Sequence, residues 1–285
     1  YKFGSRGVRG MQKVNVAGTQ NVLGTAFEVG IPRIVYTSTI AVLGDTRGKV
    51  VDEAYQMKGP WNTEYDHTKW AAHNQVAAPL IEQGAPIINV MPGAVYGPGD
   101  TSMVNDLLTL FYQGALPVFP GPETMLSFAH VEDIAEGHIL AVEKGHIGED
   151  YLLTGQIASL KEVVELCAQL LGRKPPLAYV PSRFLKPLIP VMDFLDRTFD
   201  LPDFLNADVV RILGSSYTAR ADKARDELGW RPRPLREGME ETISALVETT
   251  HPNLFSPEQQ RTAAAIGLGL AAGIMLLWLL RRRRA

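Results

Sequence analysis

Apolar positions in the first third of the chain follow two alternating periods. In residues 11–30 they recur every three or four positions, which predicts a helix that ends at Gly30, and residues 33–39 form a short apolar run typical of a buried strand. The two patterns return as a predicted helix over residues 64–82 and a predicted strand over residues 85–93. Helices and strands that alternate at this spacing predict parallel βαβ units.

The pattern becomes less regular outside these units. Residues 42–53 are rich in glycine and charge, which predicts a loop. Residues 102–114 have the period of a helix. Within residues 128–145 we expect the end of a strand and then an amphipathic helix with Asp133 as its cap.

The last third of the globular part combines one clear helix with an ambiguous segment. Ser159 precedes Glu162 by three residues, the spacing of a capping box at the start of a helix. Residues 174–213 are rich in proline and large apolar side chains. This composition suits a lid over an apolar pocket, a membrane-facing surface or an irregular part of a small second core.

Composition narrows the class of protein. The chain is 46% hydrophobic and 21% charged, with a net charge of −3, and its aromatic residues are not interleaved with Lys or Arg, so nucleic-acid binding is not expected. The six histidines are scattered, with no Cys, Asp or Glu at metal-ligand spacing, so no metal site is expected. The single cysteine, Cys167, lies in a helical pattern that predicts a buried, inert thiol.

The strongest membrane signal lies near the C-terminal end. Residues 263–280 contain no charged or strongly polar side chain, and four arginines follow them. Eighteen residues of helix rise about 27 Å, close to the hydrocarbon thickness of a bilayer. The segment therefore predicts a transmembrane anchor, with an interfacial helix or a buried core helix as alternatives.

Candidate chemistry is concentrated on the second predicted helix. Tyr65 precedes Lys69 by four residues, so both lie on one helical face. A tyrosine can move a proton at neutral pH when its phenolate is stabilised, and an ammonium group one turn away stabilises it electrostatically. Thr39, at the end of the neighbouring predicted strand, is placed to hydrogen-bond a substrate oxygen. Since chance also produces such pairs, the surrounding sequence decides their meaning.

Six segments, in the same order, resemble the extended short-chain dehydrogenase/reductase superfamily, also described as the NAD-dependent epimerase/dehydratase family. They are VNVAGTQNVL (14–23), VYTSTIAVLG (35–44), YDHTK (65–69), PGAVYGPGD (92–100), FAHVEDIAEGH (128–138) and ADKARDELGWRP (221–232). Each match is weak alone, but six in register are specific. They cover nearly everything from residue 11 to about residue 245.

The resemblance implies a cofactor and an active site. The cofactor is NAD or NADP, Tyr65 is the acid/base, Lys69 anchors the cofactor ribose and modulates the tyrosine pKa, and Thr39 is the hydroxyl partner. Asn15 matches the helix asparagine that supports the lysine through water in many members of the family. A polar residue at a helix bend is the alternative interpretation of Asn15.

Other matches have weaker functional meaning. Pro92, Gly93 and Val95 match the loop that meets the nicotinamide end of the cofactor, although turn residues that stop a strand would look the same. His130 and Asp133 also match the family, but a packed histidine and a helix cap explain them, so we place neither in the active site.

One departure from the family is large. Its members begin with a strand and a glycine-rich turn that hold the cofactor pyrophosphate, and no such element precedes Met11. We therefore expect an α/β fold: a Rossmann-type doubly wound parallel sheet without its N-terminal half, a smaller C-terminal substrate lobe and a C-terminal transmembrane helix. The expected parts are residues 1–145, with 104–125 partly in the substrate lobe, then the lobe at 146–255 and a linker with the anchor at 256–285.

The expected substrate follows from two missing arginines. Sugar-nucleotide enzymes of the family commonly carry an arginine where Leu126 stands, and a second in a stretch that this chain replaces by ILGSSYTARAD; Arg211 and Arg220 are imperfect substitutes. We therefore expect hydride transfer on a lipophilic or aromatic secondary alcohol or ketone, as in the dihydroflavonol-reductase-like and 3β-hydroxysteroid-dehydrogenase-like branches. The alternatives are a nucleotide-sugar epimerase or dehydratase and a non-catalytic, membrane-tethered cofactor-binding protein.

Location and partners follow from the same features. We expect a small lipophilic substrate, a membrane contact through the C-terminal helix and no nucleic acid, and we allow for a homodimer. Arginines after a single span favour the cytoplasm, which would put the catalytic domain outside, away from NAD(P). We resolve this conflict in favour of a membrane anchor with a cytoplasmic catalytic domain and leave the side of the arginine tail open.

Overall fold

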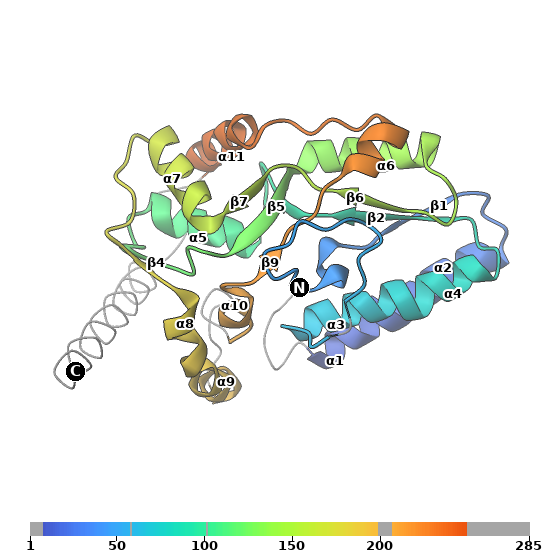
Figure 1. Ribbon diagram of the computed structural model, residues 1–285, viewed down its shortest axis with the longest axis horizontal. Helices are drawn as coiled ribbons and strands as arrows, with labels where there is room; N and C mark the ends of the chain where they lie inside the picture. The colour runs from blue at the N-terminus through green and yellow to red at the C-terminus, as the bar shows by residue number, and fades with distance from the viewer. Residues whose placement is uncertain (1–7, 58, 101, 199–206, 250–285) are drawn as a thin grey trace.

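The computed structural model describes residues 8–57, 59–100, 102–198 and 207–249 (Figure 1). Its helical segments are α1 Val8–Met11, η1 Gln12–Ala17, α2 Gly18–Glu28, η2 Ile40–Leu43, α3 Glu64–Ala71, η3 Ala72–Ala77, α4 Ala78–Glu82, α5 Met103–Tyr112, α6 Val131–Lys144, α7 Leu160–Leu170, α8 Ser182–Leu185, η4 Lys186–Leu188, α9 Ile189–Thr198, α10 Ala207–Ile212, η6 Ala224–Leu228 and α11 Leu235–Thr249. Its strands are β1 Ile34–Thr37, β2 Ile87–Pro92, β3 Ala94–Tyr96, β4 Val118–Pro120, β5 Met125–His130, β6 Asp150–Leu153, β7 Ile157–Ser159, β8 Ala178–Val180 and β9 Ser216–Tyr217.

Strands β1, β2 and β6 form a parallel sheet in the order β1, β2, β6. Helices α1 to α4 lie against one face of this sheet, and α6 lies against the other (Figure 1). Since successive residues of a strand point to opposite faces, Ile87 of β2 packs with Leu23 and Leu80, whereas Ile88 and Val90 pack on the α6 side. The predicted α/β architecture with a parallel sheet is confirmed.

The first two predicted helices are each continuous but contain a π-helical turn. Segment η1 joins α1 to α2, and η3 joins α3 to α4, with right-handed helical backbone angles at the junctions. The first helix stops where the sequence predicts, because Gly30 has a φ of 74°, a conformation that suits glycine. Both helices turn an apolar face to β1 and β2.

A second sheet follows directly on the first. In it β5 pairs in parallel with β3 and β9 and antiparallel with β7, and β4 pairs separately with β8. Helices α5, α7 and α11 pack around a core that includes Tyr96, Phe128, Cys167 and Met239. The chain passes from the first sheet to the second at Gly93, between β2 and β3. The predicted burial of Cys167 is confirmed.

The loop between η2 and α3 is fixed to both sheets. Val51 forms a β-bridge with Ala219, which follows β9. The carboxylate of Glu53 accepts a hydrogen bond from the backbone N–H of Leu152 in β6 (3.0 Å), and burial raises the pKa of Glu53. Strand β6 ends the first sheet, so Glu53 satisfies an amide on its outer edge.

One local prediction was wrong, and one segment is more regular than expected. The N-cap of α6 is His130 rather than Asp133: the Nδ1 atom of His130 accepts from the backbone N–H of Glu132 at 3.4 Å. Residues 174–213 are also more regular than their composition indicates, because η4 and helices α8, α9 and α10 lie within them. The capping box of Ser159 and Glu162 is confirmed at the start of α7.

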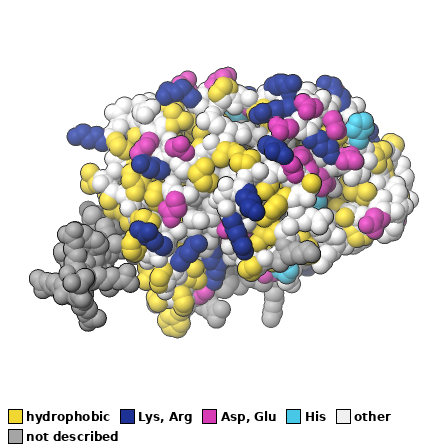
Figure 2. Space-filling view, in the orientation of Figure 1, with side chains coloured by type: hydrophobic (Ala, Val, Ile, Leu, Met, Phe, Trp, Pro, Cys, Tyr) yellow, Lys and Arg dark blue, Asp and Glu magenta, His cyan; other side chains and the backbone are white. Residues whose placement is uncertain are grey.

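The predicted transmembrane segment, residues 263–280, lies outside the described residues. Within the described ranges, every helix is too short or too polar to cross a bilayer. Acidic, basic and apolar side chains are mixed over the face of the molecule shown in Figure 2.

Candidate active site

Thr39 lies just beyond β1, where the extended chain turns into η2. Its backbone is still extended (φ −170°, ψ 154°), and its Oγ1 accepts a hydrogen bond from the backbone N–H of Ala41 at 3.2 Å. Thr39 therefore caps η2 and remains half-buried. Because the Oγ1 atom acts as an acceptor in this cap, the hydroxyl hydrogen can donate elsewhere.

Tyr65 lies in the first turn of α3. Thr63 caps this helix by accepting a hydrogen bond from the backbone N–H of Asp66 at 3.2 Å, which fixes where the helix begins. Tyr65 is half-buried and packs against the apolar cluster that contains Ile40 and Leu43 of η2. The structure thus brings the helix of Tyr65 against the turn that Thr39 begins.

Lys69 lies one turn after Tyr65 and is 9% exposed. Its Nζ donates a hydrogen bond to the carbonyl oxygen of Thr37 (3.2 Å) and lies 5.5 Å from the centre of the Tyr36 ring. Burial lowers the pKa of Lys69. In the described part of the chain no carboxylate forms an ion pair with it, so its charge is stabilised by a backbone carbonyl and an aromatic face.

Asn15 is buried and contacts α3 rather than Lys69 itself. Its Nδ2 donates a hydrogen bond to Oγ1 of Thr68 (3.0 Å), and Thr68 Oγ1 donates to the backbone oxygen of Tyr65 (3.1 Å). Asn15 therefore links the helix α1–η1–α2 to the turn that carries Tyr65 and Lys69.

Pro92, Gly93 and Val95 lie where the chain crosses between the two sheets. Pro92 ends β2, Val95 is the middle residue of β3, and the N–H of Gly93 donates to the carbonyl oxygen of Leu153 at 3.1 Å. A Cβ atom on Gly93 would lie 2.3 Å from the backbone oxygen of Ser127. The crossing therefore requires a glycine here for close backbone approach.

A buried polar network next to Tyr65 was not predicted. The hydroxyl of Tyr217, in β9, donates to the Asp66 carboxylate (2.8 Å), and Nδ2 of Asn62 donates to the Tyr217 oxygen (3.0 Å). Burial raises the pKa of Asp66 to about 6. The sequence shows an acidic residue beside Tyr65, but no local signal connects it to a tyrosine 151 positions away.

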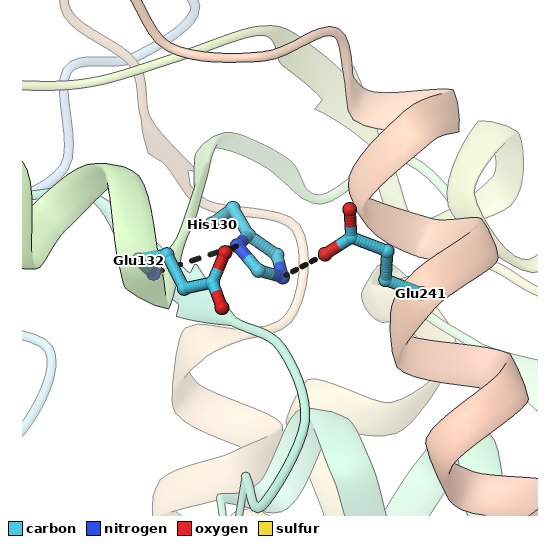
Figure 3. A group of neighbouring side chains, drawn as sticks. All are labelled: His130, Glu132 and Glu241. Carbon is cyan, nitrogen blue, oxygen red and sulfur yellow. Dashed lines mark hydrogen bonds and ion pairs between the residues drawn. The ribbon is translucent and has the colours of Figure 1, made fainter.

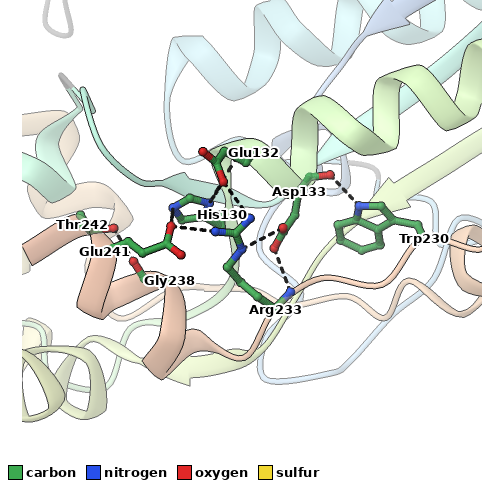
Figure 4. A network of polar contacts seen from close by, with 8 residues as sticks. All are labelled: His130, Glu132, Asp133, Trp230, Arg233, Gly238, Glu241 and Thr242. Atoms are coloured by element: carbon green, nitrogen blue, oxygen red, sulfur yellow. Dashed lines mark hydrogen bonds and ion pairs between the residues drawn. The ribbon is translucent and has the colours of Figure 1, made fainter. Parts of the chain in front are cut away.

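The structure also gathers three potential metal ligands that their spacing does not indicate. Atoms of His130, Glu132 and Glu241 lie within 4.8 Å of one another (Figure 3). The guanidinium of Arg233 already donates to both carboxylates, at 2.9 Å to Glu132 and 2.8 Å to Glu241 (Figure 4). Since this cation neutralises the carboxylates, the group is best described as an ion-pair network that joins α6 to α11.

Two hollows lie beside the loop between η2 and α3. The larger, of about 550 Å³, is lined by acidic residues together with Arg220 and Lys223. The smaller, of about 270 Å³, lies between the loop and α3, next to Trp70 and His73. The predicted catalytic residues line neither hollow, so we give neither a role in catalysis.

Comparison with known sequences places the chain in a family. The sequence model of the 3-beta hydroxysteroid dehydrogenase/isomerase family matches residues 3–150. Sterol demethylase protein B of Methylococcus capsulatus is 28% identical over 239 residues, which cover 81% of this chain and 71% of that protein. The 4-hydroxy-2-methyl-3-oxo-4-farnesyl-3,4-dihydroquinoline-1-oxide ketoreductase of Stigmatella aurantiaca is 30% identical, over 78% of this chain and 67% of that protein. The chain spans 50 to 71% of the length of the first three curated relatives it matches.

Solved structures share the fold. The crystal structure of gox2253 has a TM-score of 0.73 and 31% identity, and the match covers 87% of this chain and 76% of that one. A dTDP-glucose 4,6-dehydratase from Bacillus anthracis, solved with NAD, has a TM-score of 0.66 at 22% identity, with 84% of this chain and 69% of that one covered. The second likeness shows the fold alone.

These matches confirm the resemblance on which the site was predicted. They also confirm the prediction of NAD or NADP as the cofactor of the family. The chain belongs to the 3-beta hydroxysteroid dehydrogenase/isomerase family, a branch of the extended short-chain dehydrogenases/reductases, which are enzymes.

Proposed function

We propose that the protein transfers a hydride between NAD(P) and a secondary alcohol or ketone of a lipophilic substrate, with Tyr65 as the acid/base. The observation that carries this proposal is the packing of Tyr65 against the turn begun by Thr39, with Lys69 buried one helical turn later. The cofactor, when bound, supplies or accepts the hydride. The protein side chains bind and orient the substrate and the cofactor, and they move the proton.

Each side chain has a distinct part in this proposal. Tyr65 donates a proton to the carbonyl oxygen in reduction and takes it back in oxidation. A phenol has an ordinary pKa of about 10, so it needs the nearby charge of Lys69 to act as a base at neutral pH. The Thr39 hydroxyl donates a hydrogen bond to the same substrate oxygen, which favours the charge that develops there.

The surroundings of Lys69 fit the ribose of a nicotinamide cofactor. An ammonium group has three hydrogens, and one of them donates to the Thr37 carbonyl. The other two can donate to ribose hydroxyls, which reduces the cost of burying the charge. We propose Pro92, Gly93 and Val95 as contacts for the nicotinamide end, because they match the loop that has this role in the family. Asn15 supports the helix through Thr68.

A lipophilic substrate is the choice that the relatives' names favour. The matching family is named for 3-beta hydroxysteroids, and the relatives described above act, by their names, on a sterol and on a farnesylated ketone. A dehydratase also needs an acid and a base for the loss of water. The four residues after Thr39 form η2 and are all apolar, which supports simple hydride transfer.

A nucleotide-sugar epimerase or dehydratase is the second candidate, and the ion pairs argue against it. A sugar diphosphate needs cationic partners. Arg211 already pairs with Asp193 and Asp208, and Arg220 pairs with Asp52 at 2.6 Å. Both substitutes suggested by the sequence are therefore engaged by carboxylates. The third candidate, a cofactor-binding protein without catalysis, does not explain why Thr39, Tyr65 and Lys69 are all present.

We also propose that the protein is anchored to a membrane through residues 263–280, with its catalytic domain in the cytoplasm. An apolar surface supports membrane contact: Phe184, Leu188, Val191 and Phe194 are exposed along α8, η4 and α9. The neighbouring face of the same helices packs inward through Leu185. Large apolar side chains gathered on an exposed surface are typical of a contact with a partner or a membrane. We also propose that the Rossmann-type domain ends at residue 145 and the substrate lobe at residue 255. A homodimer is a further proposal.

The direct test compares Tyr65→Phe with the native protein. We expect a loss of turnover of about 100-fold or more on a 3β-hydroxysteroid with NAD⁺ or on the matching 3-ketosteroid with NADH or NADPH. Cofactor binding, followed by quenching of tryptophan fluorescence, should change little. Tyr179→Phe, in β8, is the matched control because that hydroxyl contacts only Glu165 among the described residues.

Two results would overturn the proposal. Full turnover in Tyr65→Phe would exclude Tyr65 as the acid/base. If the protein binds a UDP-sugar tightly and does not bind steroid or prenylated ketones, the substrate is a nucleotide sugar and not a lipophilic compound.

A further inference from the structure

Three polar side chains that the proposed chemistry does not use lie in line beside the candidate site. Oγ of Ser38 lies 2.9 Å from Nδ1 of His73, and Nε2 of His73 lies 3.3 Å from Oδ2 of Asp150. The other carboxylate oxygen of Asp150 accepts a hydrogen bond from Nδ2 of Asn89 at 2.7 Å. Ser38 and His73 are 4% and 6% exposed, so solvent does not compete for the contact between them, whereas the Asp150 side chain is 29% exposed and lines the smaller hollow.

The direction of the hydrogen bonds follows from the carboxylate. Burial alone raises the pKa of Asp150, but hydrogen bonds and the charge of His73 outweigh it, and the pKa is lowered. An ionised carboxylate only accepts, so Nε2 of His73 carries a hydrogen and donates it to Asp150. Nδ1 of His73 accepts from the Ser38 hydroxyl when the ring is neutral and donates to it when the ring is charged, so the contact with Ser38 is kept in both forms.

The line of contacts crosses the whole first sheet. Ser38 follows β1, Asn89 lies in β2, and Asp150 begins β6, where it stands opposite Asn89 in register. His73 lies in η3, the π-helical continuation of α3. π-Helical turns inside helices are frequent at functional sites, because they redirect a side chain that a regular helix would place elsewhere. Here the turn carries the histidine that joins the helix to all three strands.

The residues next to this line are those assigned to catalysis. Ser38 directly precedes Thr39, and His73 lies one turn after Lys69 and two turns after Tyr65 on the same helix. We propose that Ser38, His73 and Asp150 are positioning residues that hold the helix of Tyr65 and Lys69 in register with Thr39; this role rests on the proposed function. None of the three touches the reacting atoms.

The test uses three variants of the purified protein and one matched control. His73→Leu keeps the volume and removes both hydrogen bonds, His73→Gln keeps an amide that can donate and accept, and Ser38→Ala removes only the first contact. Gln75→Ala is the control, because Gln75 is exposed on the same η3 segment.

We expect a larger effect on kcat than on cofactor binding, because Lys69 is also held by the Thr37 carbonyl. A misplacement of about 1 Å can cost on the order of 100-fold in rate, so His73→Leu should lower kcat by about 10- to 100-fold. Its KM for the cofactor should stay within about threefold of the native value, and His73→Gln should recover part of the loss. Equal kcat values for folded His73→Leu and Gln75→Ala would overturn the positioning role.

A second measurement is independent of the substrate. Amide hydrogen exchange across residues 64–71 should be faster in His73→Leu and Ser38→Ala than in Gln75→Ala, because the helix loses its tie to the strands. Unchanged exchange in both variants would overturn the proposal even if no substrate is turned over. Absence of turnover in the native protein, with faster exchange in the variants, would count against the proposed function and leave the positioning role supported.

Discussion

The phenolic oxygen of Tyr217 lies 2.8 Å from the carboxylate of Asp66 and donates a hydrogen bond to it. Tyr217 belongs to β9 of the second sheet, and Asp66 directly follows Tyr65 on α3. The pair therefore couples the two parts of the molecule one residue away from the proposed acid/base. Because burial raises the pKa of Asp66 to about 6, the carboxylate of this pair takes up a proton near that pH.

Asp66→Asn should change how stability depends on pH. Because the pKa of Asp66 is raised from 3.8 to about 6 in the folded protein, the folded state binds more protons than the unfolded state between about pH 4 and pH 6. Stability is therefore lost as the pH rises through this window. Asparagine does not titrate, so the variant does not lose stability in this way. Its free energy of unfolding should exceed that of the native protein by about 1–3 kcal/mol at pH 8 and by less at pH 5.

Urea unfolding at pH 5 and pH 8 measures this difference. Asn62→Ala, which removes the second contact of Tyr217 but no titrating group, is the control. The same stability difference for Asp66→Asn at both pH values would show that Asp66 has an ordinary pKa.

Gly93→Ala should destabilise the crossing between the sheets. The added Cβ would lie 2.3 Å from the Ser127 backbone oxygen, and backbone on both sides must shift to relieve the clash. Overpacking of this kind typically costs about 1–3 kcal/mol. Gly10→Ala is the matched control, because a Cβ on Gly10 in α1 meets no atom within 4 Å. Thermal unfolding of both variants should separate them, with Gly10→Ala at or above the native midpoint.

Arg233→Gln should destabilise the protein through Asp133. The side chain of Asp133 is 7% exposed and accepts a hydrogen bond from Nε of Arg233 at 2.9 Å. In the variant, this buried carboxylate has lost its counter-ion. The expected loss is on the order of 3 kcal/mol. Arg236→Gln removes an exposed pair with Glu240 and should change stability by less than about 0.5 kcal/mol. Similar unfolding midpoints for the two variants would mean that Asp133 does not depend on Arg233.

How far the sequence predicts this structure depends on the range of each contact. The periods of apolar residues predict the helices and strands of the first sheet, and the spacing of Tyr65 and Lys69 predicts their shared face. Those are local properties. The partners of Asp66 and His73 are not local, because Tyr217 is 151 residues and Asp150 is 77 residues away in sequence. A single sequence contains no signal for such pairs.

The cap of α6 shows a second limit. Aspartate is a preferred capping residue, so the sequence predicts Asp133 as the cap of this helix. In the structure Arg233, 100 residues later, takes the Asp133 carboxylate, and His130 caps the helix instead. Tertiary ion pairing overrides the local preference here.

Cys167 should be unreactive in the native protein. It is 1% exposed, and burial raises the pKa of its thiol to about 12, so almost no thiolate exists at neutral pH. A thiol-specific reagent such as dithionitrobenzoate should react with one equivalent only after unfolding in guanidinium. Rapid labelling of the folded protein would place the thiol at a surface and contradict the packing of α7.

Deletion of residues 262–285 should release the protein into the soluble fraction. The segment holds the 18 apolar residues and the four arginines that predict the anchor. Centrifugation of membranes from cells that express the native and shortened proteins compares the two. If the shortened protein still sediments with membranes, the exposed side chains of α8 and α9 become the better candidate for the contact.

The outer edge of β6 has a consequence for self-association. An edge strand offers unpaired amides to which a strand of another molecule can add. The Leu152 amide is already bonded to Glu53, and the loop that carries Glu53 is itself held by the bridge between Val51 and Ala219. Another molecule could extend this sheet at β6 only after displacing the half-buried Glu53 carboxylate and its loop. Glu53 and its loop thus protect the β6 edge of the described sheet against growth from molecule to molecule.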